Sequence, residues 1–297
     1  MRSFSSLLAL SILAVCGAQK VVLTNDDGWA TAQIRAEYNA LKAAGFDVIL
    51  SAPTVNKSGT GSSTTTPTVL TSPCQFNTCP AGSPAVGFNA TDPRINYVNA
   101  FPVDSVRYGI QTLSPQFFGT RPDFVISGAN IGTNLGSVGN SGTVGAASEA
   151  ALEGIPSVAF SGASGSQVSY TTLSDTGAAS TRAANIYTDL ILKFTNALLN
   201  NSGPILPPGI SVNVNFASIS NCPSASSYKF VFTRLLANSA QTDVTTCGTD
   251  HLTAEGTVIT RGCIATVSVF NATTKRDVGA SSQAVVLNKV APILSCL

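Results

Sequence analysis

Short apolar segments and helical patterns alternate along the first part of the chain. Residues 21–23 and 46–52 are apolar runs bounded by turn-forming residues, which is typical of buried strands. Between them, the apolar residues of segment 31–44 recur at helical spacing, and Gly45 supplies a stop signal. A strand, a helix and a strand within about 30 residues form a βαβ unit, which predicts a parallel sheet with a right-handed crossover.

The same alternation continues to residue 200. It predicts two further buried strands and three more helices: strands at 124–126 and 156–161, and helices at 100–113 (starting near Asp104), 140–153 (opening at Ser141 or Thr143) and 179–200. Segment 54–67 is rich in Ser, Thr and Gly, and segment 68–100 is irregular, so neither is expected to hold a regular element. The order of elements predicts an α/β fold, Rossmann-like, with three αβα layers and a mainly parallel central sheet.

From Ile210 onward the pattern changes. Four segments alternate apolar with polar residues, as half-buried strands do: 211–216, 228–235, 257–262 and 264–270. They predict a β-rich C-terminal extension at about 210–297, which follows a core at about 19–203. A long Gly/Asn loop is expected after the strand at 124–126.

The N-terminus has the pattern of a secretory signal peptide. Residues 1–18 combine a basic start, an apolar segment and a small-residue exit, with cleavage expected after Ala18. A short membrane anchor is the alternative, but residues 7–15 fall well short of the roughly 20 apolar residues that a span requires. The mature protein is therefore expected to be secreted and not held in a membrane. Sequons that suit glycans occur at Asn89, Asn200 and Asn271.

Six cysteines remain once Cys16 leaves with the signal peptide. An even number in an exported chain indicates three disulfides. Proximity in sequence favours the pair Cys74–Cys79 and, less firmly, the pair Cys247–Cys263, which leaves Cys222–Cys296. Cysteines that bind a metal are the alternative, but the chain has no C-x-x-C and only one histidine.

Charge is sparse along the chain. Charged residues make up 10% of the sequence and the net charge is +1, with no basic stripe. A polymeric nucleic acid needs such a stripe as its electrostatic footprint, so it is excluded as a partner and any nucleotide ligand is expected to be small. Against this background, the adjacent acids Asp26 and Asp27 at the end of the first predicted strand are conspicuous.

Oxygen-bearing residues follow three of the predicted strands. Asp26 and Asp27 come after the first strand, Ser58 lies in the loop after the second, and Asn130 follows the strand at 124–126. Ligands bind beyond the carboxyl ends of parallel strands, so these residues are expected at one sheet edge. Two carboxylates, a hydroxyl and an amide oxygen suit Mg²⁺, Mn²⁺ or Ca²⁺ rather than zinc. The alternative is an Asp-rich turn in which Gly28 has a positive φ.

Five blocks of sequence occur together in one order over most of residues 20–161: NDDG, NKSGTGSS, FPVDSVRYG, PDFVISGANIGTNLG and NSGTVGAASEA, at 25–28, 56–63, 101–109, 122–136 and 140–150. In these blocks the chain resembles the SurE family of metal-dependent nucleotidases and acid phosphatases, with the signal peptide and cysteines closer to secreted fungal-type members. The resemblance implies that residues 19–297 form a SurE-like phosphatase domain. It also implies pairing of subunits through the C-terminal third, and hence a homodimer.

The resemblance further implies roles for seven residues: Asp26, Asp27, Ser58 and Asn130 as metal ligands, and Asn134, Ser141 and Thr143 as phosphate-binding residues. The implied activity is hydrolysis of small phosphomonoesters or mononucleotides by metal-activated water. Asp26 or Asp27 would orient that water or accept its proton. Asn56 also lies in a sequon, but a glycan there would crowd the Ser58 loop, so we expect this sequon to be unoccupied.

Two other functions are alternatives to the phosphatase. A secreted serine hydrolase is disfavoured because the chain has no G-x-S-x-G elbow and only His251 as a base, which is more simply a structural or surface residue. A non-catalytic exported protein that holds a structural cation at Asp26 and Asp27 is the remaining alternative. Metal-dependent stability without turnover would distinguish it from the enzyme.

Overall fold

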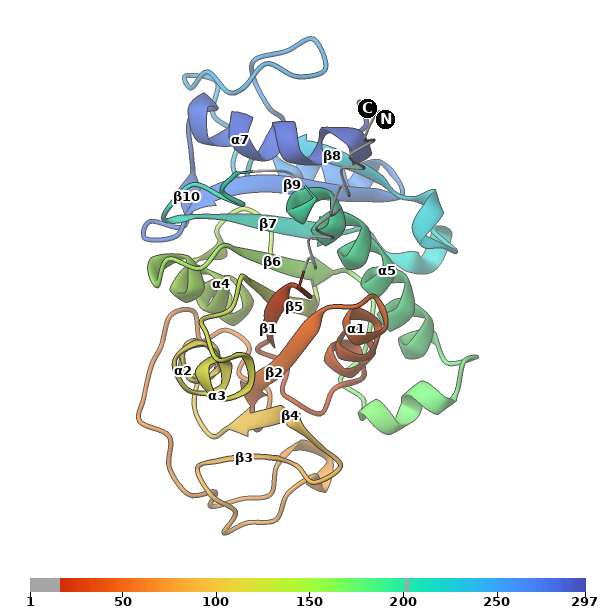
Figure 1. Ribbon diagram of the computed structural model, residues 1–297. Coiled ribbons are helices and arrows are strands. Elements are labelled where there is room, and N and C mark those ends of the chain that lie inside the picture. The colour runs from red at the N-terminus through yellow and green to blue at the C-terminus, as the bar shows by residue number, and fades with distance from the viewer. Residues whose placement is uncertain (1–16, 201–202) are drawn as a thin grey trace, which may run out of the picture.

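A single sheet of ten strands forms the centre of the computed structural model, which describes residues 17–200 and 203–297 (Figure 1). Its strands run in the order β10-β9-β7-β6-β5-β1-β2-β4-β3, and β8 also pairs with β9. The predicted signal peptide lies outside the described residues except for its last two positions. The strands are β1 Lys20–Thr24, β2 Asp47–Pro53, β3 Val86–Asn89, β4 Asp92–Val98, β5 Phe124–Ile131, β6 Ser157–Gly162, β7 Ile210–Phe216, β8 Lys229–Thr233, β9 Ile264–Asn271 and β10 Arg276–Asp277.

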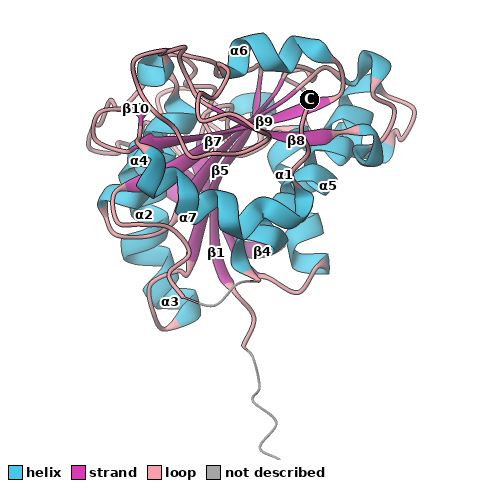
Figure 2. Ribbon diagram, turned by 90° about the horizontal axis from the view of Figure 1, so that it is seen from above, coloured by secondary structure: helices cyan, strands magenta, loops and turns pink. Residues whose placement is uncertain are grey.

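Helices cover both faces of this sheet (Figures 1 and 2). The α-helices are α1 Ala32–Ala43, α2 Pro102–Tyr108, α3 Ser114–Phe118, α4 Gly142–Leu152, α5 Ala179–Leu199, α6 Glu255–Val258 and α7 Ala280–Val290. Successive residues of a strand point to opposite faces. Accordingly, Val21 and Leu23 join the large core with α1 and α5, whereas Val22 packs with Val106 of α2 and Ala146 of α4. Burial on both faces explains why the central strands are continuous apolar runs.

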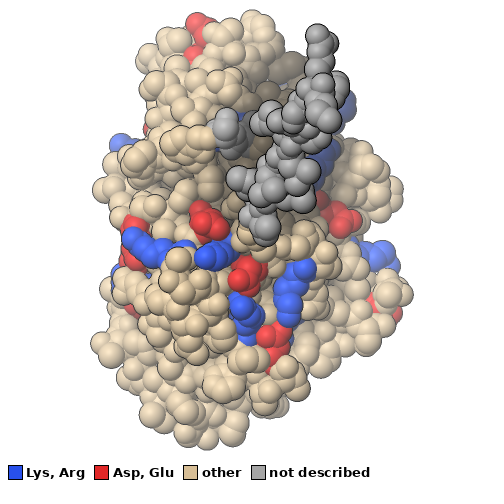
Figure 3. Space-filling view, in the orientation of Figure 1, with Lys and Arg blue, Asp and Glu red and all other residues tan. Residues whose placement is uncertain are grey.

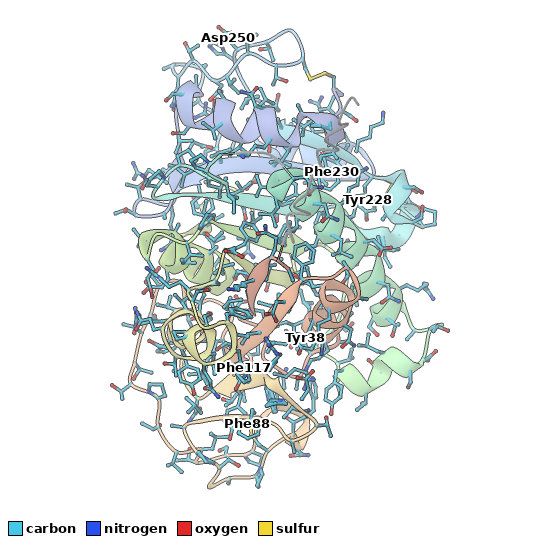
Figure 4. All side chains as sticks on the ribbon, viewed as in Figure 1. Tyr38, Phe88, Phe117, Tyr228, Phe230 and Asp250 are labelled. Carbon is cyan, nitrogen blue, oxygen red and sulfur yellow. A yellow bond between two sulfur atoms is a disulfide. The ribbon has the colours of Figure 1, made fainter. Side chains whose placement is uncertain are left out.

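The pairings confirm the predicted fold class. β1 lies between β2 and β5 and is parallel to both, and β5, β6 and β7 continue in parallel register. The C-terminal strands are present and extend this same sheet: β9 is antiparallel to β7 and parallel to β8. Side chains such as Phe230 and Tyr228 from this part therefore lie in the main body of the molecule (Figure 4).

Some local predictions are wrong. Segment 68–100 contains β3 and β4, because Pro93 and the charged residues beside it mask a strand that pairs in parallel with β2. Segment 257–262, predicted as a strand, instead forms the end of α6 and a 3₁₀ turn. Its alternation reflects one buried side of a short helical segment. The loop expected after residue 126 begins only after Ile131, because β5 continues to that residue.

The disulfides correct two of the three expected pairs. Cys74–Cys79 forms as predicted, but the other bonds are Cys222–Cys263 and Cys247–Cys296. Cys222 follows β7 and Cys263 precedes β9, and these strands are antiparallel, with Phe216 opposite Ala265. The two cysteines therefore meet at one end of the strand pair, although they are far apart in sequence. Proximity along the chain could not reveal this.

The surface carries few charges. On the face shown in Figure 3, acidic and basic side chains lie next to one another in the middle, and most of the surrounding surface is uncharged. Among the described helices, none is long and apolar enough to cross a membrane.

Candidate active site

The candidate site lies where the direction of the chain across the sheet reverses. β1 has β2 on one side and β5 on the other, which is the position where α/β sheets open a crevice at the carboxyl ends of their strands. A cavity of about 300 Å³ occurs there. Its lining includes five of the seven predicted residues: Asp26, Ser58, Asn130, Asn134 and Ser141. The fold thus brings together residues from four separate segments.

Asp26 enters the cavity from the turn after β1. Its side chain is buried, and both of its carboxylate oxygens accept hydrogen bonds from Thr143, Oδ1 from the hydroxyl at 2.8 Å and Oδ2 from the backbone N–H at 3.1 Å. A Cβ atom at position 142 would lie 2.9 Å from the Asp26 side chain, so Gly142 permits this close approach to α4. Burial raises the pKa of the Asp26 carboxyl, and the bonds from Thr143 oppose that rise.

Asp27 is fully buried and does not line the cavity. Its Oδ2 accepts from the backbone N–H of Ile131 at 2.8 Å, and its Oδ1 accepts from Nε2 of Gln167. Burial, followed by repulsion from the charge of Asp26, raises the pKa of Asp27. Within residues 17–200 and 203–297, no salt bridge involves either aspartate. Two adjacent carboxylates are therefore held by neutral donors alone.

Asn130 contributes an unused oxygen to the same wall. The pairing of β5 with β6 shifts between Ser127 and Asn130, where Gly128 has a φ of 123°. Nδ2 of Asn130 donates to the carbonyl of Gly132 at 2.7 Å, which orients the amide. Its Oδ1 is buried and has no partner among the described residues. A buried acceptor without a donor is costly, so this atom indicates that a ligand belongs here.

Ser58 is exposed in segment 54–67, but this segment is tied to the site. The N–H of Lys57 donates to the carbonyl of Asp26 at 2.7 Å, and the N–H of Gly61 donates to the carbonyl of Asn140 at 3.0 Å. The loop holds no regular element, as predicted, but these bonds join it to both the β1 turn and the segment before α4. Ser58 is therefore held at the mouth of the cavity.

The three predicted phosphate-binding residues differ in their surroundings. Nδ2 of Asn134 donates to Oγ of Ser161 at 2.8 Å, so a neighbouring strand fixes the side chain. Oγ of Ser141 caps α4 by accepting from the N–H of Val144 at 3.1 Å, while Ser141 also lines the cavity. Thr143 is fully buried and does not line it, because its hydroxyl and N–H both donate to Asp26.

Several residues that sequence reasoning missed hold this site in place. Gln167 bonds Asp27 from a loop with no recognisable pattern. Asn215 of β7 exchanges two hydrogen bonds with the backbone of Asn134, at 2.8 and 2.9 Å. The available signal was an asparagine at one of the polar positions of the alternating segment 211–216. Oε2 of the fully buried Glu37 accepts from the N–H of Ala129 at 3.0 Å, directly before Asn130.

A second buried carboxylate supports the loop after β5. Glu255 accepts from the N–H of Gly136 at 2.9 Å, from Oγ of Ser268 at 2.9 Å and from Nδ2 of Asn213 at 3.2 Å. Burial raises the pKa of Glu255 to about 8, and the charge of Asp277 adds to the rise. The loop after β5, which contributes Leu135 and Ser137 to the cavity lining, is thus anchored to the C-terminal part of the chain.

A divalent cation fits the donors that are present. The site offers hard oxygen ligands: the unpartnered Oδ1 of Asn130 and the carboxylates of Asp26 and Asp27. Among the residues that the structure describes, no positively charged side chain neutralises the two carboxylates. Ser58 adds a hydroxyl at the cavity mouth. In the described part of the chain no three of the His, Cys, Asp and Glu side chains cluster, so the site depends on neutral oxygens as well as on the two acids.

The lone histidine lies elsewhere. His251 is exposed, and its Nδ1 is 2.8 Å from Oδ1 of Asp250, which Figure 4 labels on a loop well away from the sheet. His251 does not line the active-site cavity. The side chain of Asn56 is exposed beside that cavity, and its Oδ1 accepts from the N–H of Ser58 at 2.7 Å. Non-occupancy of the Asn56 sequon stays a prediction.

Comparison with known proteins gives three findings. The model of a family described as "Survival protein SurE" matches residues 21–242. An acid phosphatase of Yarrowia lipolytica is 34% identical over 234 residues, and a 5'-nucleotidase SurE of Gloeobacter violaceus is 39% identical over 146 residues. The solved structure of the SurE protein from Aquifex aeolicus has a TM-score of 0.58 at 23% identity, and the match covers 85% of this chain and 93% of that one.

The coverage of the two curated relatives is partial. The matches take in 75% and 49% of this chain, and 64% and 50% of the acid phosphatase and the nucleotidase respectively. The chain thus spans between half and two thirds of the length of these relatives. The likeness to the Aquifex structure, at its low identity, supports the fold.

Proposed function

Because this chain belongs to the SurE family, we propose that it is a divalent-metal-dependent phosphomonoesterase that acts on small phosphate esters or mononucleotides. The observation that carries the proposal is the buried, unpartnered Oδ1 of Asn130 in the wall of a cavity that Asp26 also lines. The names of the acid phosphatase and nucleotidase relatives support the reaction class. Mg²⁺, Mn²⁺ and Ca²⁺ all suit such oxygen ligands.

Asp26, Asp27, Ser58 and Asn130 are the residues proposed to hold the cation. When bound, it would supply positive charge against the phosphate oxygens and lower the pKa of water in the site. Asp26 lines the cavity and is therefore the carboxylate placed to orient the attacking water. Asp27 is turned toward the N–H of Ile131, where it fixes the segment that carries Asn130.

The remaining phosphate contacts are assigned to Asn134 and Ser141. Oγ of Ser141 accepts from the helix backbone, which leaves its own O–H free to donate to a phosphate oxygen. Donors placed in advance stabilise the charge that develops during phosphoryl transfer. Thr143 directs both of its donors at Asp26, so a phosphate contact from Thr143 requires one of those bonds to open. We therefore propose that Thr143 acts mainly by positioning Asp26.

In the proposed reaction a water oxygen forms a bond to phosphorus while the bond between phosphorus and the leaving oxygen breaks. The leaving oxygen takes a proton, and the products are inorganic phosphate and an alcohol or nucleoside. Secretion is part of the proposal: it is supported by the three disulfide-bonded pairs, which are typical of exported proteins, and by the fungal acid phosphatase relative.

The test is hydrolysis of p-nitrophenyl phosphate before and after EDTA treatment, with each of the three metals then restored. We expect activity to vanish with EDTA and to return with at least one metal. Asp26→Ala should lower kcat/KM by about 10²–10³-fold because the cation and the attacking water lose a shared ligand. Asp250→Ala, which removes an exposed carboxylate far from the cavity, is the matched control.

Two outcomes would contradict the proposal. Undiminished hydrolysis by Asp26→Ala would show that the reaction occurs elsewhere. Metal-dependent thermal stability without turnover of any phosphomonoester would instead favour the non-catalytic, cation-binding protein.

A further inference from the structure

A second, larger cavity adjoins the active-site cavity. Its volume is about 490 Å³, and it shares Ser137 and Val138 with the lining of the first. Two segments of the C-terminal part form most of its walls: residues 234–238 after β8 and residues 274–277 around the start of β10. A substrate whose phosphate lies beside Asp26 could therefore extend across this shared wall into the second cavity.

The turn between β9 and β10 directly contacts the loop that carries Ser58. Nζ of Lys275 lies 2.6 Å from Oγ of Ser62, four residues after Ser58. Figures 1 and 2 agree in drawing β10, an edge strand of the sheet, near α4, the helix whose Thr143 holds Asp26. The second cavity is thus joined to the proposed active site at two places, the Ser58 loop and the wall at Ser137.

The charge of this cavity is unbalanced. Arg234, a buried member of its lining, is neutralised by Asp243, which accepts two hydrogen bonds from Nη1 at 2.8 and 2.9 Å. The carboxylate of Asp277 accepts from N–H groups of the 234–238 wall, at 2.6 and 3.0 Å, and also lies 3.7 Å from Nη2 of Arg234. Lys275 and Arg276 also line the cavity, and within the described ranges neither forms a salt bridge. Lys275 and Arg276 are therefore two cations without an ion-pair partner among the described residues, and together with Arg234, Asp243 and Asp277 they leave the cavity with an excess of one positive charge.

We propose that this second cavity holds the leaving group of the substrate, and that Lys275 and Arg276 select phosphomonoesters whose leaving group bears a second anionic group, either a carboxylate or a second phosphate. The ammonium of Lys275 supplies a point charge, and the guanidinium of Arg276 supplies paired donors that match either anion. This inference rests on the proposed phosphatase function. Both residues lie beyond positions 21–242, the part of the chain that matches the family model.

The experiment compares matched substrates that differ in one charge. Phosphoglycerate is measured against glycerol phosphate for the carboxylate, and a nucleoside 3',5'-bisphosphate against the 5'-monophosphate for the second phosphate. We expect the wild-type protein to prefer the more anionic member of at least one pair. Which pair shows the preference identifies the anion that the cavity takes.

Lys275→Met and Arg276→Met test the residues themselves. Each should lower kcat/KM for the preferred, more anionic substrate by about tenfold, since a hydrogen bond between charged groups is lost. Arg276→Met should leave the less anionic partner within about twofold. Lys275→Met also loses the bond to Ser62, so its readout is the ratio of kcat/KM between the two substrates. Lys229→Met removes one exposed positive charge from the start of β8, and as a matched control for overall charge it should leave the preference unchanged.

Calorimetry measures how tightly the same four compounds bind to the metal-loaded protein, independently of whether they are hydrolysed. If no compound is hydrolysed, the proposed function fails, yet a binding preference that disappears in Lys275→Met would still support the anion-binding cavity. If hydrolysis occurs but the preference is absent, or falls equally in Lys229→Met, the inference about the second cavity is overturned. The same holds if binding shows no preference.

Discussion

Two groups of buried charged side chains in this molecule are built in opposite ways. At the sheet edge after β1, Asp26 and Asp27 lie side by side, with only neutral donors around them and with an unpartnered oxygen on Asn130. Beneath the loop after β8, Arg234 and Asp243 form a buried ion pair. The first group lacks a counter-charge, whereas the second contains its own.

The ion pair is also complete in its hydrogen bonds. Asp243 accepts from Arg234, from Nε2 of Gln283 at 2.8 Å and from the N–H of Leu252 at 2.9 Å. Arg234 in turn donates to the carbonyl of Leu236. Buried polar groups that satisfy one another hold a structure together, while a buried group left incomplete indicates a missing ligand. The same physical rule therefore assigns a structural role to one group and a binding role to the other.

The largest effect on stability is expected from breaking the buried ion pair between Arg234 and Asp243. Asp243→Ala removes the carboxylate that accepts both bonds from Nη1 of Arg234 and leaves the buried guanidinium with the more distant carboxylate of Asp277, 3.7 Å from Nη2, so we expect the free energy of unfolding to fall by about 3 kcal/mol. Denaturant unfolding at neutral pH measures it. Asp250→Ala removes an exposed aspartate from the same loop and should cause no measurable change. Equal losses in the two variants would show that Arg234 finds other compensation.

Glu255 is a buried carboxylate whose hydrogen-bond partners are neutral, and its titration should make the free energy of unfolding depend on pH. Its pKa of about 8 in the folded state exceeds its ordinary value of 4.5. Between these pH values the folded protein retains a proton that the unfolded chain releases, so the free energy of unfolding should fall as the pH rises from about 4.5 to about 8. The total loss should be a few kcal/mol, since each pKa unit corresponds to about 1.4 kcal/mol.

Glu255→Gln removes this titration while an amide oxygen still accepts from Gly136. We therefore expect urea unfolding of this variant, measured across the same pH range, to show a flatter pH dependence than the wild type. An unchanged slope would mean that other groups, with Asp277 the nearest charge, cause the decline.

The smallest effect is expected at Glu37. Burial raises the pKa of Glu37 well above its ordinary value, which favours the uncharged form of the side chain. Glu37→Gln keeps an acceptor for the N–H of Ala129 and should change the free energy of unfolding by less than about 1 kcal/mol. Activity should stay within about twofold.

Glu37→Leu is the comparison variant. It leaves the N–H of Ala129 without a partner beside Asn130, and we expect a loss of about 1–3 kcal/mol with a larger fall in activity than in stability. Thermal unfolding and p-nitrophenyl phosphate turnover measure the two effects. Similar behaviour of both variants would show that the Glu37 carboxyl does not support the wall of the site.

Local patterns were sufficient for most of the fold. The apolar run 21–23, the helical period of 31–44 and the run 46–52 each correspond to an element, and their order predicted the parallel sheet. These local patterns gave wrong secondary structure where the residue pattern did not match the packing of the segment in the fold. β4 begins with a charged residue and a proline, yet pairs with β2, and the alternation of 257–262 belongs to a short helical segment.

The chemistry of the site and its place at a sheet edge could be predicted, but its supporting contacts could not. The positions of Asp26 and Asn130 relative to strand ends indicated a common edge, and the structure places both in one cavity. The contact of Thr143 with Asp26 and that of Gln167 with Asp27 were not predictable, because each joins residues more than a hundred positions apart. Nothing local to either residue encodes such a partner.

The sequence by itself determined which residue types are available and which short segments become strands and helices, because periodicity and turn residues act over a few neighbours. Only the tertiary structure decided the partners: Cys222 with Cys263, Lys275 with the Ser58 loop, and the burial that leaves Asp26 and Asp27 without a counter-charge. Pairing and burial depend on which distant segments the packed sheet brings together. The acidic turn after β1 becomes a candidate metal site through those contacts.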